Sequence, residues 1–462
     1  MPWGDENMIS FAREINDNFE SYMNDLQKLV SHNSIYDLST AGEGKPFGQA
    51  NKEVLEEMLN IGIKDGYTVK NVDGYAGHID IGEGNEVIGV LGHLDIVPVN
   101  EVGWDTDPFT LTIKDGKVFG RGTTDDKGPI LAAYYAAKMI QQKGLKTSKK
   151  IRIIFGCNEE SGSRCMRYYF TKEPFPTMGF TPDANFPVIY GEKKGAHFGI
   201  KGNLAQNDLV SFKAGTVANI VPERAVAIVK KTSEELKESF EAYLAQYGLN
   251  GTLEDIEGGC KIELIGKSSH ASLPHLGKNA AVYLGSYLNT VITHPLVQFL
   301  DQYFALDYSG EKLGIAITGM MGPLTCNVGI CNYEKGEVTI ILDCRCPHEL
   351  DDDATLAKVE KAVKEFNLNV ESHFGKALYV DPESDLIKAL HSAYVECTGD
   401  SEAKPIAIGG GTYAKTMPNC VAFGPEFDGT DNQIHQNNEF AVIDQIKLEM
   451  EIYANALYNL AK

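Results

Sequence analysis

Two apolar stretches limit the folds that this chain can adopt. Residues 87–91 (VIGVL) and residues 149–156 (KKIRIIFG) are apolar over most of their length and do not alternate with polar residues. Strands that are buried on both faces read this way, and they occur in parallel sheets covered by helices. The segment 128–144 between them reads as a helix, with Pro129 in its first turn and Gly144 just past its end. This order of strand, helix and strand predicts an open α/β sheet.

The pattern changes near residue 190 and returns near residue 380. Between these points, alternating strands mix with long helical segments, which is an α+β pattern. The sequence therefore predicts a discontinuous α/β domain made of residues 1–190 and 380–462. Its sheet should be mostly parallel and doubly wound, and residues 191–379 should form an inserted α+β domain.

Charge and composition exclude several classes of protein. The chain has 462 residues, with 42 Lys and Arg against 64 Asp and Glu, which gives a formal net charge of −22. Nucleic acids and anionic membranes need a basic face, so neither is expected as a partner. The N-terminus lacks the features of a signal peptide, and no apolar run is long enough to span a bilayer. The nine cysteines form no CxxC pair, and we expect a cytoplasmic protein with unpaired thiols.

Residues suited to metal binding follow both predicted buried strands. His93 and Asp95 come after the first strand and lie two residues apart, so they project to the same side of an extended chain. Glu159 and Glu160 come after the second strand. Open α/β sheets place their sites at the carboxyl ends of strands. Two adjacent glutamates repel each other unless a cation lies beside them, so the pair points to a cation at this edge.

Three further motifs carry the same kinds of side chain. Asp125 and Asp126 precede a helix, Asp183 lies in the loop FTPDANFP, and His435 lies in the loop DNQIHQNNE. Taken singly, the first motif reads as a helix cap and the second as a turn. Together with the strand-end residues they supply two histidines and several carboxylates. That set suits two divalent ions in a nitrogen and oxygen site, with Zn²⁺ expected first and Mn²⁺ or Co²⁺ as alternatives.

A resemblance to a known family rests on motifs between residues 92 and 439. In chain order these are GHLDIVP, GRGTTDDKGP, NEESGS, PDANFP, GKSSHAS, DCRCP, GGGTYAK and IHQNNE. They resemble the aminoacylase and carboxypeptidase family of co-catalytic metallohydrolases. Within that family the chain looks most like the PepV-type dipeptidases, which include enzymes that cleave Xaa-His dipeptides such as carnosine. The resemblance covers essentially the whole chain.

The resemblance implies roles for residues of the α/β domain. Asp125 would bridge the two metal ions, with His93 and Asp183 completing one site. Glu160 and His435 would complete the other site. Glu159 matches the general base, and Asp95 matches the partner that orients the His93 ring. The resemblance also implies a cis peptide bond after Asp125.

The resemblance further implies that the inserted domain is a lid that contributes to substrate binding. His270 in SSHAS matches the residue that stabilises the oxyanion. Asn219 and Arg345 match positions that contact substrate, with Arg345 as a clamp for the terminal carboxylate. Gly411 and Thr412, from the α/β domain, would lie near that carboxylate.

These features predict a dipeptidase that uses two metal ions and a glutamate base, and that acts on short peptides with a free N-terminus. A related amidohydrolase that removes acyl groups from amino acids is the alternative. A non-catalytic protein that binds peptide or metal is the third reading. We also expect that Asp126 favours substrates with a free ammonium group, and that the protein is a monomer.

Overall fold

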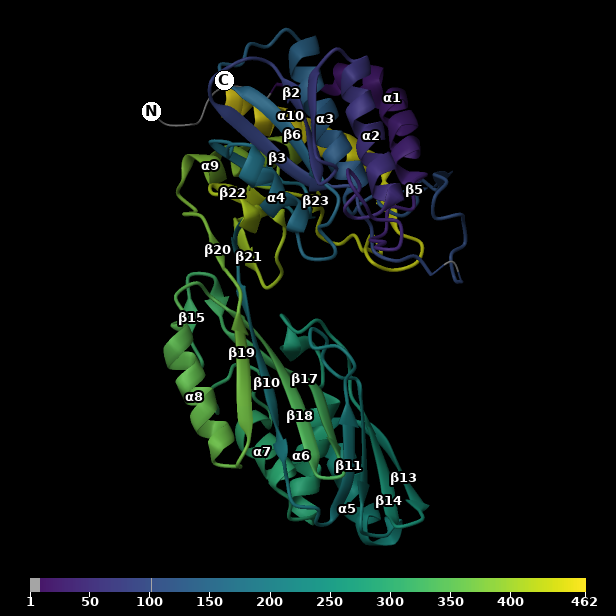
Figure 1. Ribbon diagram of the computed structural model, residues 1–462, viewed down its shortest axis with the longest axis vertical. Helices are drawn as coiled ribbons and strands as arrows, with labels where there is room; N and C mark the ends of the chain where they lie inside the picture. The colour runs from purple at the N-terminus through teal and green to yellow at the C-terminus, as the bar shows by residue number, and fades with distance from the viewer. Residues whose placement is uncertain (1–8, 101) are drawn as a thin grey trace. The chain divides into compact units, whose positions relative to one another are not determined.

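The computed structural model describes residues 9–100 and 102–462, which form two compact units (Figure 1). The first, called the α/β unit, comprises Met1–Gly191, Tyr379–Ile406 and Gly411–Lys462, and its residues 1–8 and 101 lie outside the described residues. The second, called the insert unit, comprises Glu192–Leu378 and Ala407–Gly410. The short segment Ala407–Gly410 thus joins the insert unit, although it follows residue 380 in the chain.

The sheet of the α/β unit is parallel at its centre and antiparallel toward its edges. Strands β6, β3, β7 and β22 run parallel to their neighbours in that order, whereas β1, β2 and β9 pair antiparallel. Across the sheet the order is β1 (Thr68–Val72), β2 (Ala76–Ile81), β6 (Lys150–Gly156), β3 (Val87–His93), β7 (Met178–Thr181), β22 (Cys420–Ala422), β9 (Ile189–Glu192) and β20 (Leu378–Tyr379), with β21 (Ile406–Ile408) beside β9. The parallel centre contains both apolar stretches, as their continuous burial requires.

Helices cover both faces of this sheet. On one face, a Cβ atom at Gly92 of β3 would lie 2.7 Å from the Cβ of Ile130 in α3. On the other face, a Cβ atom at Gly156 of β6 would lie 2.8 Å from Cys165 and Met166 of α4. The helices are α1 (Ala12–Val30), α2 (Gln49–Lys64), α3 (Lys127–Gln142), α4 (Arg164–Lys172), α9 (Asp385–Thr398), α10 (Ile443–Ala461) and the 3₁₀ turn η2 (Tyr413–Thr416). Glycine at both positions lets a helix pack close to its strand.

Two small sheets shape the loops at the edge of the α/β unit. β24 (Phe440–Val442) pairs with β5 (Lys117–Phe119), which pairs with β4 (Thr112–Lys114). β23 (Pro425–Glu426) pairs in parallel with β8 (Ala184–Asn185). These pairings bring segments that are far apart in the sequence next to one another.

The insert unit is an antiparallel sheet with helices on one face (Figure 1). The strand order is β13 (Asn250–Ile256), β14 (Gly259–Ile265), β12 (Arg224–Val229), β11 (Leu209–Ala214), β17 (Thr325–Glu334), β18 (Glu337–Cys346), β10 (Lys194–Asn203) and β19 (Asn369–Phe374). Alternate residues are buried along β14 and β12, which is the pattern of strands with one solvated face. Its helices are α5 (Ser233–Tyr247), α6 (Ala280–Val291), α7 (Pro295–Phe304), α8 (Asp352–Lys364) and the 3₁₀ turn η1 (Pro274–Leu276), and a small hairpin joins β15 (Thr318–Gly319) to β16 (Gly322–Pro323).

The predicted fold class is confirmed, because an α/β sheet with a parallel centre is interrupted by an α+β insertion. The nine cysteines are all unpaired, as predicted. Eight of them are buried and Cys397 is partly buried.

Candidate metal centre

Three of the predicted motifs meet at one edge of the sheet. β6, β3 and β7 are adjacent parallel strands, and His93 at the end of β3 pairs with Gly156 at the end of β6. Glu159 and Glu160 follow β6, and Asp183 follows β7 by two residues. The register of these strands therefore brings the three motifs together at their carboxyl ends.

The five predicted metal ligands form one continuous cluster. His93 Nε2 lies 3.0 Å from Asp125 Oδ1 and 3.8 Å from Asp183 Oδ2. His435 Nε2 lies 2.8 Å from Asp125 Oδ2 and 3.2 Å from Glu160 Oε1. The two oxygens of Asp125 thus face different imidazoles, which is the arrangement that a bridging carboxylate requires.

Glu159 belongs to the same cluster. Its carboxylate lies within 4.8 Å of ligand atoms of His93 and Asp183, and the same limit holds for a second group made of His93, Asp125 and Glu160. The two groups share His93, whose Nε2 atom can bind one ion only. They show that Glu159 lies among the predicted ligands.

Asp95 holds the loop that carries the two glutamates. Its carboxylate oxygens accept the backbone N–H groups of Glu159 and Glu160 at 2.9 and 3.2 Å. The Nδ1 atom of His93 lies 2.9 Å from the Asp95 main-chain carbonyl oxygen and 3.6 Å from its carboxylate. Asp95 therefore contacts the His93 ring chiefly through its main chain, while its side chain positions the glutamates.

Burial and crowding of acids determine the protonation of the cluster. Burial is the largest influence on the pKa of Glu159 and raises it to about 8, with Glu160 among the charges that add to the rise. Burial also raises the pKa of Asp183 well above its usual range. Hydrogen bonds to Asp125 and Glu160 raise the pKa of His435 to about 10. The acids therefore hold positive charge strongly, whether as protonated imidazole or as metal ion.

The chemistry of this donor set fits divalent metal ions. Among the described residues, the ion-pair partners of Asp125, Asp183 and Glu160 are the imidazoles of His93 and His435. Imidazole nitrogen and carboxylate oxygen are ligands that Zn²⁺, Mn²⁺ and Co²⁺ all accept. Two ions bring four positive charges to a cluster whose three ligand carboxylates bring three negative ones.

A buried ion pair that the sequence analysis did not identify supports the loop that carries Asp125. Glu439 accepts the backbone N–H groups of Gly122, Thr124 and Asp125 at 2.9–3.1 Å. Its Oε2 also accepts a hydrogen bond of 2.7 Å from Arg121 Nη1, and Arg121 Nη2 donates to the carbonyl oxygen of Gln436. Glu439 is the last residue of the motif IHQNNE, four positions after His435, so that motif was the signal available in the sequence.

Asp126 does not face a substrate. Its side chain is fully buried, and its Oδ2 accepts the backbone N–H of His93 at 2.9 Å. The expectation that Asp126 selects a substrate ammonium is therefore wrong, because a helix and a strand enclose it. The Asp125–Asp126 peptide bond is cis, as predicted.

The predicted residues of the insert unit form a separate group within that unit. The backbone N–H of Ala271 donates to the carbonyl oxygen of Asn219 at 2.9 Å, which places Asn219 beside His270, and both side chains are exposed. His270 Nδ1 lies 2.7 Å from Ser272 Oγ. Although the residue is exposed, partial loss of solvent around the His270 ring is the largest influence on its pKa and lowers it, and the charge of Arg345 lowers it further.

Arg345 is already engaged within the insert unit. Its Nε and Nη2 donate to the two carboxylate oxygens of Asp343 at 2.6 and 2.9 Å, and Nη1 donates to the Gly409 carbonyl at 3.0 Å. The bidentate pair fixes the plane of the guanidinium. A substrate carboxylate would have to bind at the remaining edge of that plane or displace the Gly409 carbonyl.

Gly411 and Thr412 lie in the α/β unit, where they precede η2. Thr412 Oγ1 accepts the backbone N–H of Ala414 at 3.2 Å and so caps this turn. A Cβ atom at Gly411 would lie 2.7 Å from Lys415 Nζ. The predicted contact of these two residues with a substrate carboxylate stays a prediction.

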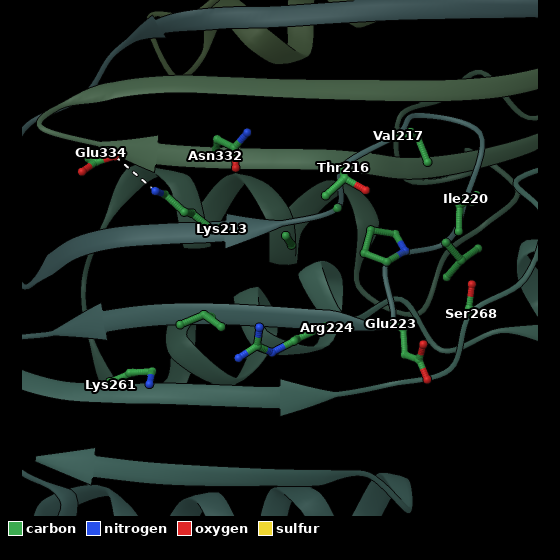
Figure 2. Close-up of a pocket in the computed structure, with 15 residues that line it drawn as sticks. Lys213, Thr216, Val217, Ile220, Glu223, Arg224, Lys261, Ser268, Asn332 and Glu334 are labelled. Carbon is green, nitrogen blue, oxygen red and sulfur yellow. Dashed lines mark ion pairs between the residues drawn. The ribbon is translucent and has the colours of Figure 1, made fainter. Parts of the chain in front are cut away.

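A cavity of about 990 Å³ lies on the open face of the insert sheet (Figure 2). Two of its lysines are paired: Lys213 lies 3.4 Å from Glu334, and Lys261 lies 2.9 Å from Glu254. Glu223 also lines the cavity and has no ion-pair partner among the described residues. Asn219 and His270 are not among the lining residues, and we assign the cavity no role.

Known proteins resemble this chain over almost its whole length. The profile of "Peptidase family M20/M25/M40" matches residues 89–459. The Bacillus subtilis protein named "Putative dipeptidase YtjP" is 38% identical over 456 residues, which cover 96% of this chain and 98% of that protein. A Staphylococcus haemolyticus protein, also named as a putative dipeptidase, is 36% identical over 456 residues and covers 95% of this chain and 96% of its own.

Solved structures share the fold at low sequence identity. Human carnosine dipeptidase 1 has a TM-score of 0.58 at 15% identity, covering 98% of this chain and 99% of its own. Aminoacylhistidine dipeptidase from Vibrio alginolyticus has a TM-score of 0.56 at 14% identity and covers 96% of both chains. Within the part of the chain that is described, no helix has the length and apolar character needed to cross a membrane.

Proposed function

Because this chain belongs to peptidase family M20/M25/M40, a family of metallopeptidases, we propose that it is a dipeptidase that depends on two divalent metal ions. Its proposed substrates are dipeptides and other short peptides with a free N-terminus. Relatives named as dipeptidases match it over almost their whole length, which supports this choice over a deacylase. Within the family, the proposal narrows the reaction to peptide-bond hydrolysis of small substrates.

The observation that carries the proposal is the division of Asp125 between two imidazoles. One carboxylate oxygen faces His93 and the other faces His435, at 3.0 and 2.8 Å. Helix capping, the alternative reading of this residue, needs only one oxygen directed at backbone N–H groups. We propose that His93, Asp125 and Asp183 hold one metal ion, and that Asp125, Glu160 and His435 hold the other.

Bound ions would polarise the peptide carbonyl and lower the pKa of an attacking water. Glu159 is proposed to accept the proton of that water and then to donate it to the leaving amine. Asp95 contributes by fixing the Glu159 backbone, which orients the side chain.

We propose that residues of the insert unit act on the substrate. His270 would donate a hydrogen bond to the oxyanion, with its ring fixed by Ser272. Asn219 and Arg345 would contact the substrate, Arg345 through the terminal carboxylate. In this proposal the unit 191–379 is the lid domain and the remaining chain is the catalytic domain, and Gly411 and Thr412 bind near the same carboxylate.

The experiment that tests this function compares two substrate classes. The chain, loaded separately with Zn²⁺, Mn²⁺ and Co²⁺, is assayed against a dipeptide panel that includes β-Ala-His and against N-acetyl amino acids. We expect hydrolysis of dipeptides that a chelator abolishes and added metal restores. Preferential release of acetate would identify a deacylase, and hydrolysis that survives chelation would refute the metal assignment.

Two further predictions belong to the proposal. We propose a monomer, which sedimentation tests against twice the 50.6 kDa mass of one chain. We propose a cytoplasmic location, which fractionation of the native cells tests.

A further inference from the structure

One acid beside the metal cluster has no part in the proposed mechanism. Glu426 lies in β23, which pairs with β8, and β8 begins directly after the proposed ligand Asp183. The backbone N–H of Phe186 donates to the Glu426 carbonyl oxygen at 2.9 Å, so the pairing is fixed by a main-chain hydrogen bond. The side chain of Glu426 is partly buried. It is therefore held next to the cluster by main-chain pairing.

The pairing of the strands puts Glu426 on the same side of the chain as Asp183. Glu426 pairs with Asn185, which follows Asp183 by two residues, and side chains two apart on an extended chain project to one side. Burial raises the pKa of Glu426 to about 7, and the charges of Asp125 and Asp431 add to this rise, whereas His435 acts in the opposite direction. Asp125 and His435 are both proposed ligands, and all four residues lie in the α/β unit.

The Glu426 carboxylate lacks a cationic partner. Among the described residues, it makes no side-chain hydrogen bond and no ion pair, unlike Asp125, Asp183 and Glu160. A partly buried carboxylate without a partner is costly, and a cationic ligand would offset that cost. The proposed mechanism supplies such a ligand, because the α-ammonium of a dipeptide is only two bonds from the carbonyl carbon under attack.

We propose that Glu426 is a specificity residue that binds a positively charged ammonium group of the substrate. The inference rests on the proposed function and deepens it, and it replaces the role first expected of Asp126. The ammonium comes from the N-terminal α-amine or from a basic side chain on the first residue. Both sources present the same charge to Glu426, and the experiment separates them.

The test uses Glu426→Gln, which keeps the size of the side chain and removes its charge. Asp428→Asn is the matched control, because Asp428 is an exposed acid two residues along the same loop. Four substrates form two pairs: Ala-Ala with N-acetyl-Ala-Ala, and Lys-Ala with Leu-Ala. Metal content is measured for each variant.

If the inference is right, Glu426→Gln lowers kcat/KM by roughly 10- to 100-fold for the cationic member of at least one pair, the range of a lost charge-assisted hydrogen bond. A loss of Ala-Ala hydrolysis that spares N-acetyl-Ala-Ala identifies the α-ammonium. A loss specific to Lys-Ala over Leu-Ala identifies the side chain. Both metals remain bound, and Asp428→Asn behaves like the parent.

Equal losses on all four substrates, an unchanged pattern, or loss of a metal would overturn the inference.

A binding experiment by calorimetry separates failure of this inference from failure of the proposed function. Ketomethylene isosteres of the same peptides, in which an uncharged CO–CH2 unit replaces the scissile amide, are titrated into the parent and the variant. If the parent hydrolyses no peptide but Glu426→Gln still weakens only the cationic isosteres, the ammonium site stands and the dipeptidase assignment fails. If the parent hydrolyses dipeptides and Glu426→Gln binds every isostere as tightly as the parent does, the dipeptidase assignment stands and the ammonium site fails.

Discussion

Replacing Glu439 by alanine should destabilise the α/β unit strongly. The Glu439 carboxylate is fully buried and accepts three backbone N–H groups as well as the Arg121 guanidinium, whose own side chain is 3% exposed. Removing one partner of a buried ion pair costs about 3–5 kcal/mol, because the remaining charge is left buried and unpaired. Each backbone donor left without an acceptor adds roughly 1–3 kcal/mol unless water reaches it. We therefore expect Glu439→Ala to lose at least ~3 kcal/mol in free energy of unfolding.

The assay is urea unfolding of the metal-free protein, with circular dichroism as the readout. The two units need not unfold together, so the transition of the α/β unit is fitted separately. Glu371→Gln, which removes one charge of an exposed pair with Lys201, is the control and should unfold like the parent. If Glu439→Ala were as stable as this control, the carboxylate would not be supporting the loop that carries Asp125.

Two further predictions concern the metal cluster. Binding of the ion at His435 should weaken progressively as pH falls below about 10, because the acids raise the pKa of His435 to about 10 and this ion must displace the proton. Calorimetry in buffers with different ionisation enthalpies should show proton release on binding, and binding without it would contradict the account. Asp95→Asn should lower metal affinity by about 10- to 100-fold, because the asparagine side chain has one acceptor oxygen for the backbone N–H groups of Glu159 and Glu160. An unchanged dissociation constant for the metal would show that Asp95 does not position the two glutamates.

Much of the metal centre could be predicted because its motifs are local. His93 and the two glutamates directly follow strands that the apolar pattern identifies, and parallel pairing then places them at one edge. The roles of Asp125 and His435 needed the family resemblance. Neither residue has a local pattern that separates a ligand from a helix cap or a polar loop.

The positions of Glu439, Glu426 and Asp126 could not be predicted, because they depend on contacts between segments that are far apart in the sequence. Glu439 is buried only because β24 pairs with β5, which brings the C-terminal loop against residues 121–125. Glu426 lies beside the segment that follows Asp183 because β23 pairs with β8. Asp126 was expected to favour a substrate ammonium because it adds a carboxylate after Asp125, but its side chain is buried and accepts the backbone N–H of His93. Local sequence carries no record of such pairings.

The central claim is that the adjacent glutamates divide two tasks, and metal analysis of their alanine variants tests it most directly. Glu160→Ala should lose one metal ion per chain, because it removes a ligand that lies beside His435. Glu159→Ala should keep both ions and lose hydrolysis by about 10²–10⁴-fold, the range expected for loss of a general base. Equal metal content in both variants and the parent would contradict the assignment.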